Sequence, residues 1–403
     1  MIDPKELIKN LSVESLCETA DSFFQTLEQD NPLVHMGKPF SDLNGAADTL
    51  QNMSHLLSEL QLGKAMTVLD FASGTCWLSR FLTQLRCRTI SCDVSETALR
   101  MGQELFSRFP PIGDKTYEPE FLKFDGHKID LPSEAVDRII CHDGLHHVPN
   151  QPEIISELAR VLKTGGIAAF SEPGRFHSQS PESQHDMKNF NVLENDIILP
   201  EIFTIAQKHG FTDIKIMPVC NMQISLQDYQ QLTSNKSSTP PEKTITKHIR
   251  NLLNYRSIFF LYKGEYIPDS RCPTELSHSI STHRKNISVK AGESFVIPLN
   301  ISNTGRSKWI VSSFNNIGVV FIATHLYDSS GNLIRGQVRQ GGLSRHRLID
   351  AVNSGETLEQ DIEIQIPEAG KFSLSIDLHS QEICWFETLG SESLKLDITV
   401  LPN

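Results

Sequence analysis

The chain has 403 residues, too many for one ordinary domain, so two domains with a smaller elaboration are expected. Hydrophobic residues make up 39% and charged residues 21% of the sequence, a composition typical of a globular protein with sizeable cores. The formal net charge of −12 disfavours a nucleic-acid partner, because phosphate binding needs a basic face.

Targeting signals and cysteine pairs are not evident in the sequence. No apolar run approaches the ~20 residues of a membrane span. The first residues, Met1 to Glu6, lack the basic start and apolar core of a signal peptide, so a cytoplasmic chain is expected. The eight cysteines are scattered without a Cys-x-x-Cys pair, which indicates reduced thiols in the core rather than disulfides or a zinc knuckle.

Residues 1–62 predict an amino-terminal helical cap. Apolar residues recur at helical spacing in residues 11–27 and again in residues 46–62. The loop between them, residues 31–42, contains two prolines and several exposed apolar residues. Two interpretations remain open: a connector packed on its own helices, or a lid that turns His35, Lys38 and Phe40 toward a ligand.

Residues 67–78 read as a buried strand, a loop of small residues and a helix, the arrangement on which nucleotide-like ligands bind. A dinucleotide fingerprint would need its third glycine where Trp77 stands, and the indole argues against NAD. The alternative pattern, Asp-x-Gly-x-Gly-x-Gly, is met by Asp70, Ala72, Gly74 and Cys76. It resembles motif I of the class I S-adenosylmethionine-dependent methyltransferases, with two glycines replaced by other small residues.

Acidic residues follow the next two predicted strands. Asp93 ends the strand at residues 88–92, about 20 positions after the glycine loop, where a carboxylate can accept both hydroxyls of a ribose. Alternatively, Asp93 caps the following helix, although Ser95 could do so itself. Asp125 follows the strand at residues 118–124, where its carboxylate can accept the exocyclic amine of adenine.

The fourth strand, residues 136–141, leads into a loop with three histidines, an amphipathic helix that ends near Gly165, and a fifth strand that ends at Glu172. This order resembles the second half of the same methyltransferase family. The resemblance implies an α/β, Rossmann-like methyltransferase domain over residues 63–268. It also implies a seven-stranded sheet whose last strand, near residues 257–263, is antiparallel.

The resemblance implies S-adenosylmethionine as the cofactor. The predicted cofactor-binding residues are Lys38, Phe40, Asp70, Ala72, Ser73, Gly74, Cys76, Trp77, Asp93, Val94, Asp125, Gly126, His142 and Asp143. The methyl group of this cofactor is already activated, so the protein mainly aligns the acceptor, and a hydroxyl acceptor also needs a general base.

The candidate bases are His146, His147, Glu172 and His177. His146 is preferred, since in the resembled family the loop after strand four borders the methyl group. Alternatively, the histidine pair only orders this loop. Three ligands on one helix face are not available from His142, Asp143, His146 and His147, so no metal site is predicted.

Residues 280–403 show short alternating strands with turn signals, which predicts an all-β antiparallel sandwich. Asn300 to Gly305 followed by Trp309, and Ile383 to Glu387, resemble immunoglobulin-like accessory domains of bacterial surface-polysaccharide enzymes. Trp309, Trp385 and Phe386 are expected to be core or inter-domain anchors rather than a sugar platform.

The sequence therefore predicts methyl transfer to a small-molecule or glycan acceptor, with a sugar hydroxyl or carbon preferred. No nucleic-acid partner is expected. The sandwich is expected to engage an assembly partner or a second copy of the chain. The alternative is a non-catalytic module that keeps the fold, suggested by the replaced glycines at Ala72 and Cys76, with its sandwich engaging a glycan or a partner. A nicotinamide-dependent reductase is the more distant alternative.

Overall fold

The computed structural model describes residues 1–112, 117–219, 225–233, 253–336 and 345–402. The chain divides into two compact units, the first formed by Met1–Leu62 with Met66–Tyr266 and the second by Gly63–Ala65 with Ile267–Asn403. Among the described residues, none of the helices combines the length and the apolar character needed to cross a bilayer.

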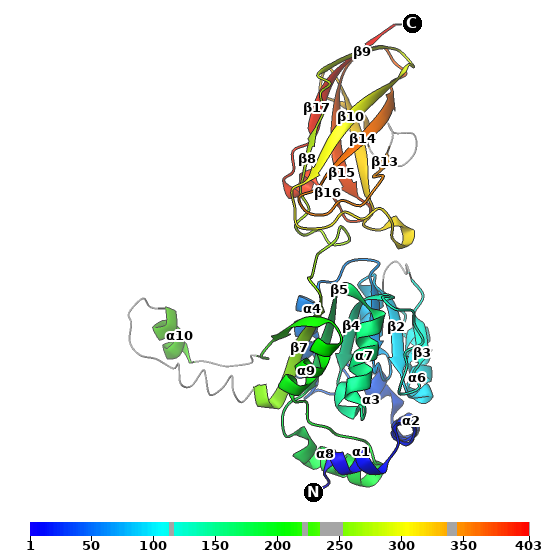
Figure 1. The fold of residues 1–403 in the computed structure, drawn as a ribbon, viewed down its shortest axis with the longest axis vertical. Coiled ribbons are helices and arrows are strands. Elements are labelled where there is room, and N and C mark those ends of the chain that lie inside the picture. Colours follow the sequence, from blue (N-terminus) through cyan, green and yellow to red (C-terminus); the bar gives the residue numbers. More distant parts are fainter. Residues whose placement is uncertain (113–116, 220–224, 234–252, 337–344, 403) are drawn as a thin grey trace. The chain divides into compact units, whose positions relative to one another are not determined.

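A seven-stranded mixed sheet forms the centre of the first unit, in the order β3-β2-β1-β4-β5-β7-β6 (Figure 1). Neighbouring strands from β1 to β5 are parallel, whereas β7 is antiparallel to both β5 and β6. The Rossmann-like sheet with an antiparallel last strand is therefore confirmed. The strands are β1 (Thr67–Phe71), β2 (Arg88–Asp93), β3 (Glu120–Lys123), β4 (Val136–His142), β5 (Leu162–Pro173), β6 (Phe211–Ile216) and β7 (Arg256–Lys263).

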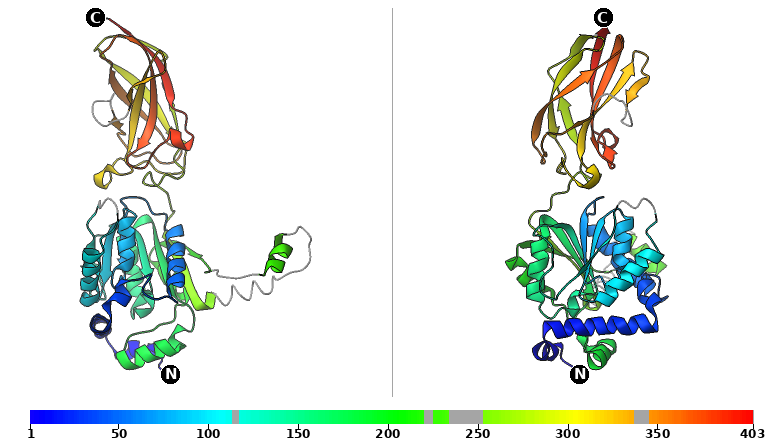
Figure 2. Two further views of the ribbon diagram at one scale, coloured as in Figure 1. Left: turned by 180° about the vertical axis from the view of Figure 1, so that it is seen from behind. Right: turned by 90° about the vertical axis from the view of Figure 1, so that its right-hand side faces the viewer.

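Helices cover both faces of this sheet, because its central strands are buried on both sides (Figure 2). Leu56 of α4, Leu78 of α5 and Met101 of α6 join the core on one face, and Ile155 of α7 and Ile202 of α9 join the core on the other. The longer helices are α2 (Val13–Asp30), α4 (Ala46–Glu59), α5 (Trp77–Gln84), α6 (Glu96–Arg108), α7 (Gln151–Val161), α8 (Pro181–Phe190), α9 (Leu199–Lys208) and α10 (Leu226–Thr233).

The amino-terminal helices belong to the first unit, and α2 lies across the edge at which the parallel strands end (Figure 2). The Asp21 carboxylate of α2 accepts hydrogen bonds from Ser95 Oγ and Thr97 N at the start of α6, which fixes α2 beside the end of β2. The helices expected at residues 11–27 and 46–62 correspond to α2 and α4. Three helices were not predicted from the sequence, namely α1 (Pro4–Asn10), α3 (Pro32–Met36) and α8.

Two glycines outside the motif make room for the side chains of Ala72 and Cys76, which replace glycines of the motif. The Cys76 side chain is fully buried, and a methyl group added to Gly102 of α6 would overlap its Sγ atom. A methyl group added to Gly144, in the loop after β4, would lie 2.5 Å from the Cβ atom of Ala72. The space lost within the motif is thus recovered on the elements that pack against it.

The second unit contains two sheets, one with the order β14-β10-β8 and one with the order β12-β11-β15-β17-β9. Residues of both sheets share one hydrophobic core, in which Trp309 and Phe386 are fully buried. The prediction of wholly antiparallel pairing is wrong for β9, which pairs in parallel with β17. The strands are β8 (His278–Ser281), β9 (Asn286–Lys290), β10 (Ser294–Asn303), β11 (Val320–Asp328), β12 (Leu333–Gly336), β13 (His346–Arg347), β14 (Thr357–Gln365), β15 (Gly370–Ser380), β16 (Cys384–Trp385) and β17 (Leu394–Leu401).

Because Cys76 packs against Gly102, we predict that the effect of Gly102→Ala on stability depends on which residue stands at position 76. In the wild-type chain it should lower the free energy of unfolding of the first unit by about 1–2 kcal/mol, because overpacking outweighs the helix propensity of alanine. In a Cys76→Gly background it should instead be neutral or stabilising by up to about 1 kcal/mol. Urea unfolding of the four chains measures this, and an equal effect in both backgrounds would contradict the pairing.

Candidate active site

A cavity of about 250 Å³ lies at the carboxyl edge of the sheet, between the loop after β1 and the amino-terminal helices. A smaller, more apolar cavity of about 80 Å³ shares its wall at Ala72, Asp93 and Val94, and Gly126 lines it. The predicted cofactor-binding residues that line the larger cavity are Lys38, Ala72, Ser73, Gly74, Trp77, Asp93, Val94, His142 and Asp143. The structure thus brings most of the predicted set together around one space.

The loop after β1 bends sharply, with positive φ angles at Ala72, Gly74 and Cys76. Its shape is fixed from behind by Asp70, whose Oδ2 atom accepts hydrogen bonds from Ser79 N at 3.0 Å and Ser79 Oγ at 2.7 Å. Burial raises the pKa of Asp70 to about 7, although these hydrogen bonds oppose the shift. Asp70 therefore anchors the first turn of α5 to β1 instead of facing the cavity.

Asp93 connects the end of β2 with the same loop. Its Oδ2 atom accepts a hydrogen bond from Gly74 N at 2.8 Å, and its Oδ1 atom accepts one from Ser95 N at 2.8 Å. Burial raises the pKa of Asp93 to about 6, against the effect of these backbone N–H groups. Each carboxylate oxygen retains a second lone pair, so Asp93 can still accept hydrogen bonds from ligand hydroxyls in the cavity.

Besides Asp70, three predicted cofactor-binding residues line neither of the two cavities. The Cys76 side chain packs between α5 and α6, as described above. Phe40 is 71% exposed and lines a neighbouring hollow, which Lys38 and Trp77 also border. The exposed Asp125 carboxylate accepts hydrogen bonds from the N–H groups of two following residues, at 2.8 and 2.7 Å, which close a local turn.

His142 presents an unsatisfied polar atom at the cavity. It is buried with its ring edge-on to Trp77, and its Nε2 atom has no hydrogen-bond partner. Burial lowers the pKa of His142. The next residue, Asp143, is held by Arg256 of β7 at 2.6 Å. Although burial would raise the pKa of Asp143, His142 and Arg256 hold it well below its ordinary value.

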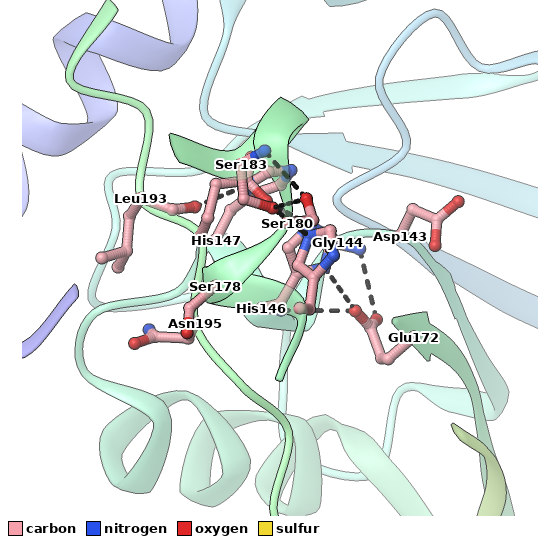
Figure 3. A network of polar contacts seen from close by, with 12 residues as sticks. Asp143, Gly144, His146, His147, Glu172, Ser178, Ser180, Ser183, Leu193 and Asn195 are labelled. Carbon is pink, nitrogen blue, oxygen red and sulfur yellow. Dashed lines mark hydrogen bonds and ion pairs between the residues drawn. The ribbon is translucent and has the colours of Figure 1, made fainter. Parts of the chain in front are cut away.

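The fully buried carboxylate of Glu172, at the end of β5, organises the loop after β4 (Figure 3). Its Oε1 atom accepts hydrogen bonds from the backbone N–H groups of Gly144 at 3.2 Å and Leu145 at 2.9 Å. Its Oε2 atom accepts one from His146 Nδ1 at 2.7 Å. Burial would raise the pKa of Glu172, but the His146 hydrogen bond lowers it, and the same bond raises the pKa of His146 against burial. Glu172 is thus a positioning residue for the loop.

The segment between α8 and α9 pairs with this loop and brings Glu194 to it. His147 Nδ1 donates a hydrogen bond to the carbonyl oxygen of Leu193 at 2.7 Å, and Asn195 N donates one to the carbonyl oxygen of His146 at 3.0 Å (Figure 3). Glu194 stands between Leu193 and Asn195 in the chain. It is buried, and its carboxylate lies 3.6 Å from His146 Nε2.

His177 completes this group, because its Nε2 atom lies 2.6 Å from Glu194 Oε2. We refer to His146, His147, His177 and Glu194 as the histidine cluster. Only His147 and Glu194 of this cluster line the cavity, whereas His146 and His177 stand behind them. Three of the four candidate bases named from the sequence therefore meet around one carboxylate, and the fourth, Glu172, is hydrogen-bonded to one of them, His146.

Sequence reasoning missed Glu194 and the apolar wall of the cavity. Glu194 lies in an irregular segment without a motif, and only its placement between two paired backbone groups reveals it. The apolar spacing in the sequence of α2 predicts a helix, but it does not indicate that this helix forms a wall of the cavity. The missed lining residues are Leu16, Thr19, Ala20, Phe23, Phe24, Asp186, Val192, Leu193 and Glu194.

The residues of the cavity fit S-adenosylmethionine. A buried carboxylate with spare acceptor capacity lies at the end of β2, where a ribose is bound in such sheets. The Lys38 ammonium provides a donor for a carboxylate, and the unsatisfied Nε2 atom of His142, whose Nδ1 atom lies 3.2 Å from Asp143 Oδ2, provides an acceptor for an ammonium group. The adjoining apolar cavity, with Val94 and Gly126 in its wall, suits a planar base.

Comparisons with known proteins agree with this fit. Residues 69–170 match the family model described as "Methyltransferase domain". The ubiquinone/menaquinone biosynthesis C-methyltransferase of Coxiella burnetii is 23% identical over 189 residues, which is 42% of this chain and 72% of that protein. The arsenite methyltransferase of Mus musculus is 26% identical over 204 residues, which is 45% of this chain and 53% of that protein.

Among solved structures, phosphoethanolamine N-methyltransferase 2 of Haemonchus contortus, in complex with phosphomonomethylethanolamine and S-adenosylhomocysteine, is similar to this chain. The TM-score is 0.42 at 15% sequence identity, and the match covers 64% of this chain and 61% of that one.

The pKa of Asp93 predicts how cofactor affinity depends on pH. If the ionised carboxylate binds the ribose, the apparent Kd for S-adenosylmethionine should rise about tenfold between about pH 7 and about pH 5, as protonation removes the competent form. Isothermal titration calorimetry at each pH measures this Kd. Asp93→Asn should bind weakly with no such dependence. Asp125→Asn should keep the wild-type dependence, because backbone N–H groups lower the pKa of Asp125. A wild-type Kd that is constant over this range would contradict the role of Asp93.

Proposed function

This chain is an S-adenosylmethionine-dependent methyltransferase, and we propose that it methylates a hydroxyl or carbon of a small polar acceptor, preferably a sugar. The observation that carries the proposal is that one cavity has the motif loop and Asp93 on one wall and His147 with Glu194 on another. Cofactor-binding groups and proton-accepting groups therefore face the same space.

Each cofactor-facing residue has a proposed role. Asp93 accepts the ribose hydroxyls, and Val94 and Gly126 border the adenine. Lys38 donates to the carboxylate of the methionine moiety, and the Nε2 lone pair of His142, whose Nδ1 atom faces Asp143, accepts from its ammonium group. When bound, the cofactor supplies a methyl group that is already activated, so the chain contributes alignment of the acceptor and exclusion of water.

The histidine cluster is the proposed site of proton removal from the acceptor. His147 donates its Nδ1 proton to a backbone carbonyl, so in the neutral ring the Nε2 atom carries the free lone pair. Glu194 reaches the cavity beside it, and His177 holds the Glu194 carboxylate. His146 supports the cluster from behind through its hydrogen bond to Glu172.

A sugar in a surface glycan or its nucleotide-linked precursor is the preferred acceptor. Acidic side chains of Asp186 and Glu194 line the cavity together with the imidazole of His147, and such groups can bind vicinal hydroxyls. The second unit supports this choice if it is an immunoglobulin-like sandwich similar to those of surface-polysaccharide enzymes. The C-methyltransferase relative keeps a carbon acceptor open.

A non-catalytic module is the less favoured alternative. It was suggested by the replaced glycines of the motif, and Gly102 and Gly144 accommodate both replacements. In that alternative the second unit would engage a glycan or an assembly partner while the cavity binds cofactor without turnover.

Acceptor identity can be tested with methyl-labelled cofactor and a panel of nucleotide sugars and isolated polysaccharides. The expected result is label on the carbohydrate together with one S-adenosylhomocysteine per methyl group transferred. Label found only on lipid, protein or an unrelated metabolite would refute the sugar acceptor. Cofactor binding without turnover on any acceptor would favour the non-catalytic alternative.

Substitutions of His147 and Glu194 should separate catalysis from cofactor binding. His147→Ala and Glu194→Gln are each expected to lower kcat by about 10²-fold or more, because general acid-base assistance typically contributes 10²–10⁴-fold. The Kd for S-adenosylmethionine should change by less than about threefold, which is below 1 kcal/mol. Turnover and calorimetry measure the two effects. His209→Ala, at the end of α9, is the control, and wild-type kcat in both cluster variants would refute the role of the cluster.

A further inference from the structure

We propose that His146, His147 and Glu194 form a binding site for one divalent transition-metal cation, a deepening that rests on the proposed function of the histidine cluster. One ligand atom from each of the three side chains lies within 4.8 Å of those of the other two. His146 Nε2 and Glu194 Oε2 are 3.6 Å apart. Two ligands of a tetrahedral ion at about 2.0–2.1 Å are about 3.3–3.4 Å apart, so little movement is needed.

Each of the three side chains already has an outer partner that orients it. His146 Nδ1 is bonded to Glu172, and His147 Nδ1 donates to the Leu193 carbonyl. Glu194 is held by His177 Nε2. Metal-binding histidines usually donate their other ring N–H to a carboxylate or a backbone carbonyl, which fixes the tautomer with its lone pair toward the ion. His146 shows this pattern fully, because its Nε2 atom lies 3.6 Å from Glu194 Oε2; in His147 the Nδ1 atom is bonded to the carbonyl, which leaves its Nε2 atom to bind the ion.

The charge around the cluster also favours a cation. Glu172 and Glu194 are both buried, and the partners recorded for them in the described part of the chain are imidazoles, a thiol and backbone N–H groups. The nearby Arg256 is paired with Asp143. Buried carboxylates need compensating positive charge, and in the described part of the chain protons on the histidines or a bound cation would add to the charge that Arg256 supplies to Glu172.

The ligand chemistry selects the kind of ion. Two imidazoles and one carboxylate suit Zn²⁺, Co²⁺ or Ni²⁺, whereas Mg²⁺ and Ca²⁺ prefer oxygen ligands only. His147 and Glu194 border the cavity, so an ion held by them would have an open side toward an acceptor. A divalent ion would lower the pKa of a hydroxyl bound to it; His147 would then act as a ligand of the ion in place of the base, and the proton would pass to solvent water.

The test uses the full chain, stripped with a chelator and titrated with Co²⁺ alone. The expected result is one Co²⁺ per chain, with visible absorption bands of a low-symmetry site. His147→Ala and Glu194→Gln should each weaken binding by about 100-fold. Glu172→Gln should weaken it by about 10- to 100-fold, the usual effect of removing an outer partner. His209→Ala should bind Co²⁺ like the wild type.

Circular dichroism and S-adenosylmethionine affinity establish that each variant is folded. The proposal is overturned if the wild type binds no Co²⁺, or if folded His147→Ala and Glu194→Gln bind it as tightly as the wild type does. Methyl transfer to a sugar is measured in a separate assay. A chain that binds Co²⁺ but methylates no sugar would refute the proposed acceptor alone, and a chain that methylates a sugar without binding Co²⁺ would refute the metal site alone.

Discussion

The buried carboxylate of Glu172 is the constraint on which the site depends. A carboxylate inside a protein must have its lone pairs satisfied, and Glu172 achieves this with the backbone N–H groups of the loop after β4 and the imidazole of His146. These bonds fix the loop at the end of β5. The loop in turn binds the segment that carries Glu194, so one satisfied acid sets the position of the whole histidine cluster.

The motif loop is constrained by steric fit instead. Ala72 and Cys76 stand where the resembled motif has glycine, and their side chains fill the space left by Gly144 and Gly102. Because Gly144 belongs to the loop that Glu172 holds, the cofactor-facing loop and the histidine cluster share one contact. The motif loop and the histidine cluster are therefore positioned together, as the proposed methyl transfer would require.

Much of the first unit could be predicted from the sequence, because periodicity and motif order are local signals that the sheet preserves. Asp93 and His142 reach the cavity since residues at the carboxyl ends of parallel strands meet at one edge. Asp125, Phe40 and Cys76 do not line the larger cavity, because a local turn, an exposed loop and a helix contact take up their side chains. These three local environments have no signature in the sequence.

Glu194 shows most clearly which part of the site could not be predicted from the sequence. From the sequence, no metal site is predicted at His142, Asp143, His146 and His147, because their spacing does not place three ligands on one helix face. In the structure the first two are turned toward Trp77 and Arg256, and the carboxylate that lies beside His146 and His147 comes from a distant irregular segment. A residue brought in through backbone pairing cannot be found from spacing, so the metal site proposed above includes a residue that the sequence analysis did not consider.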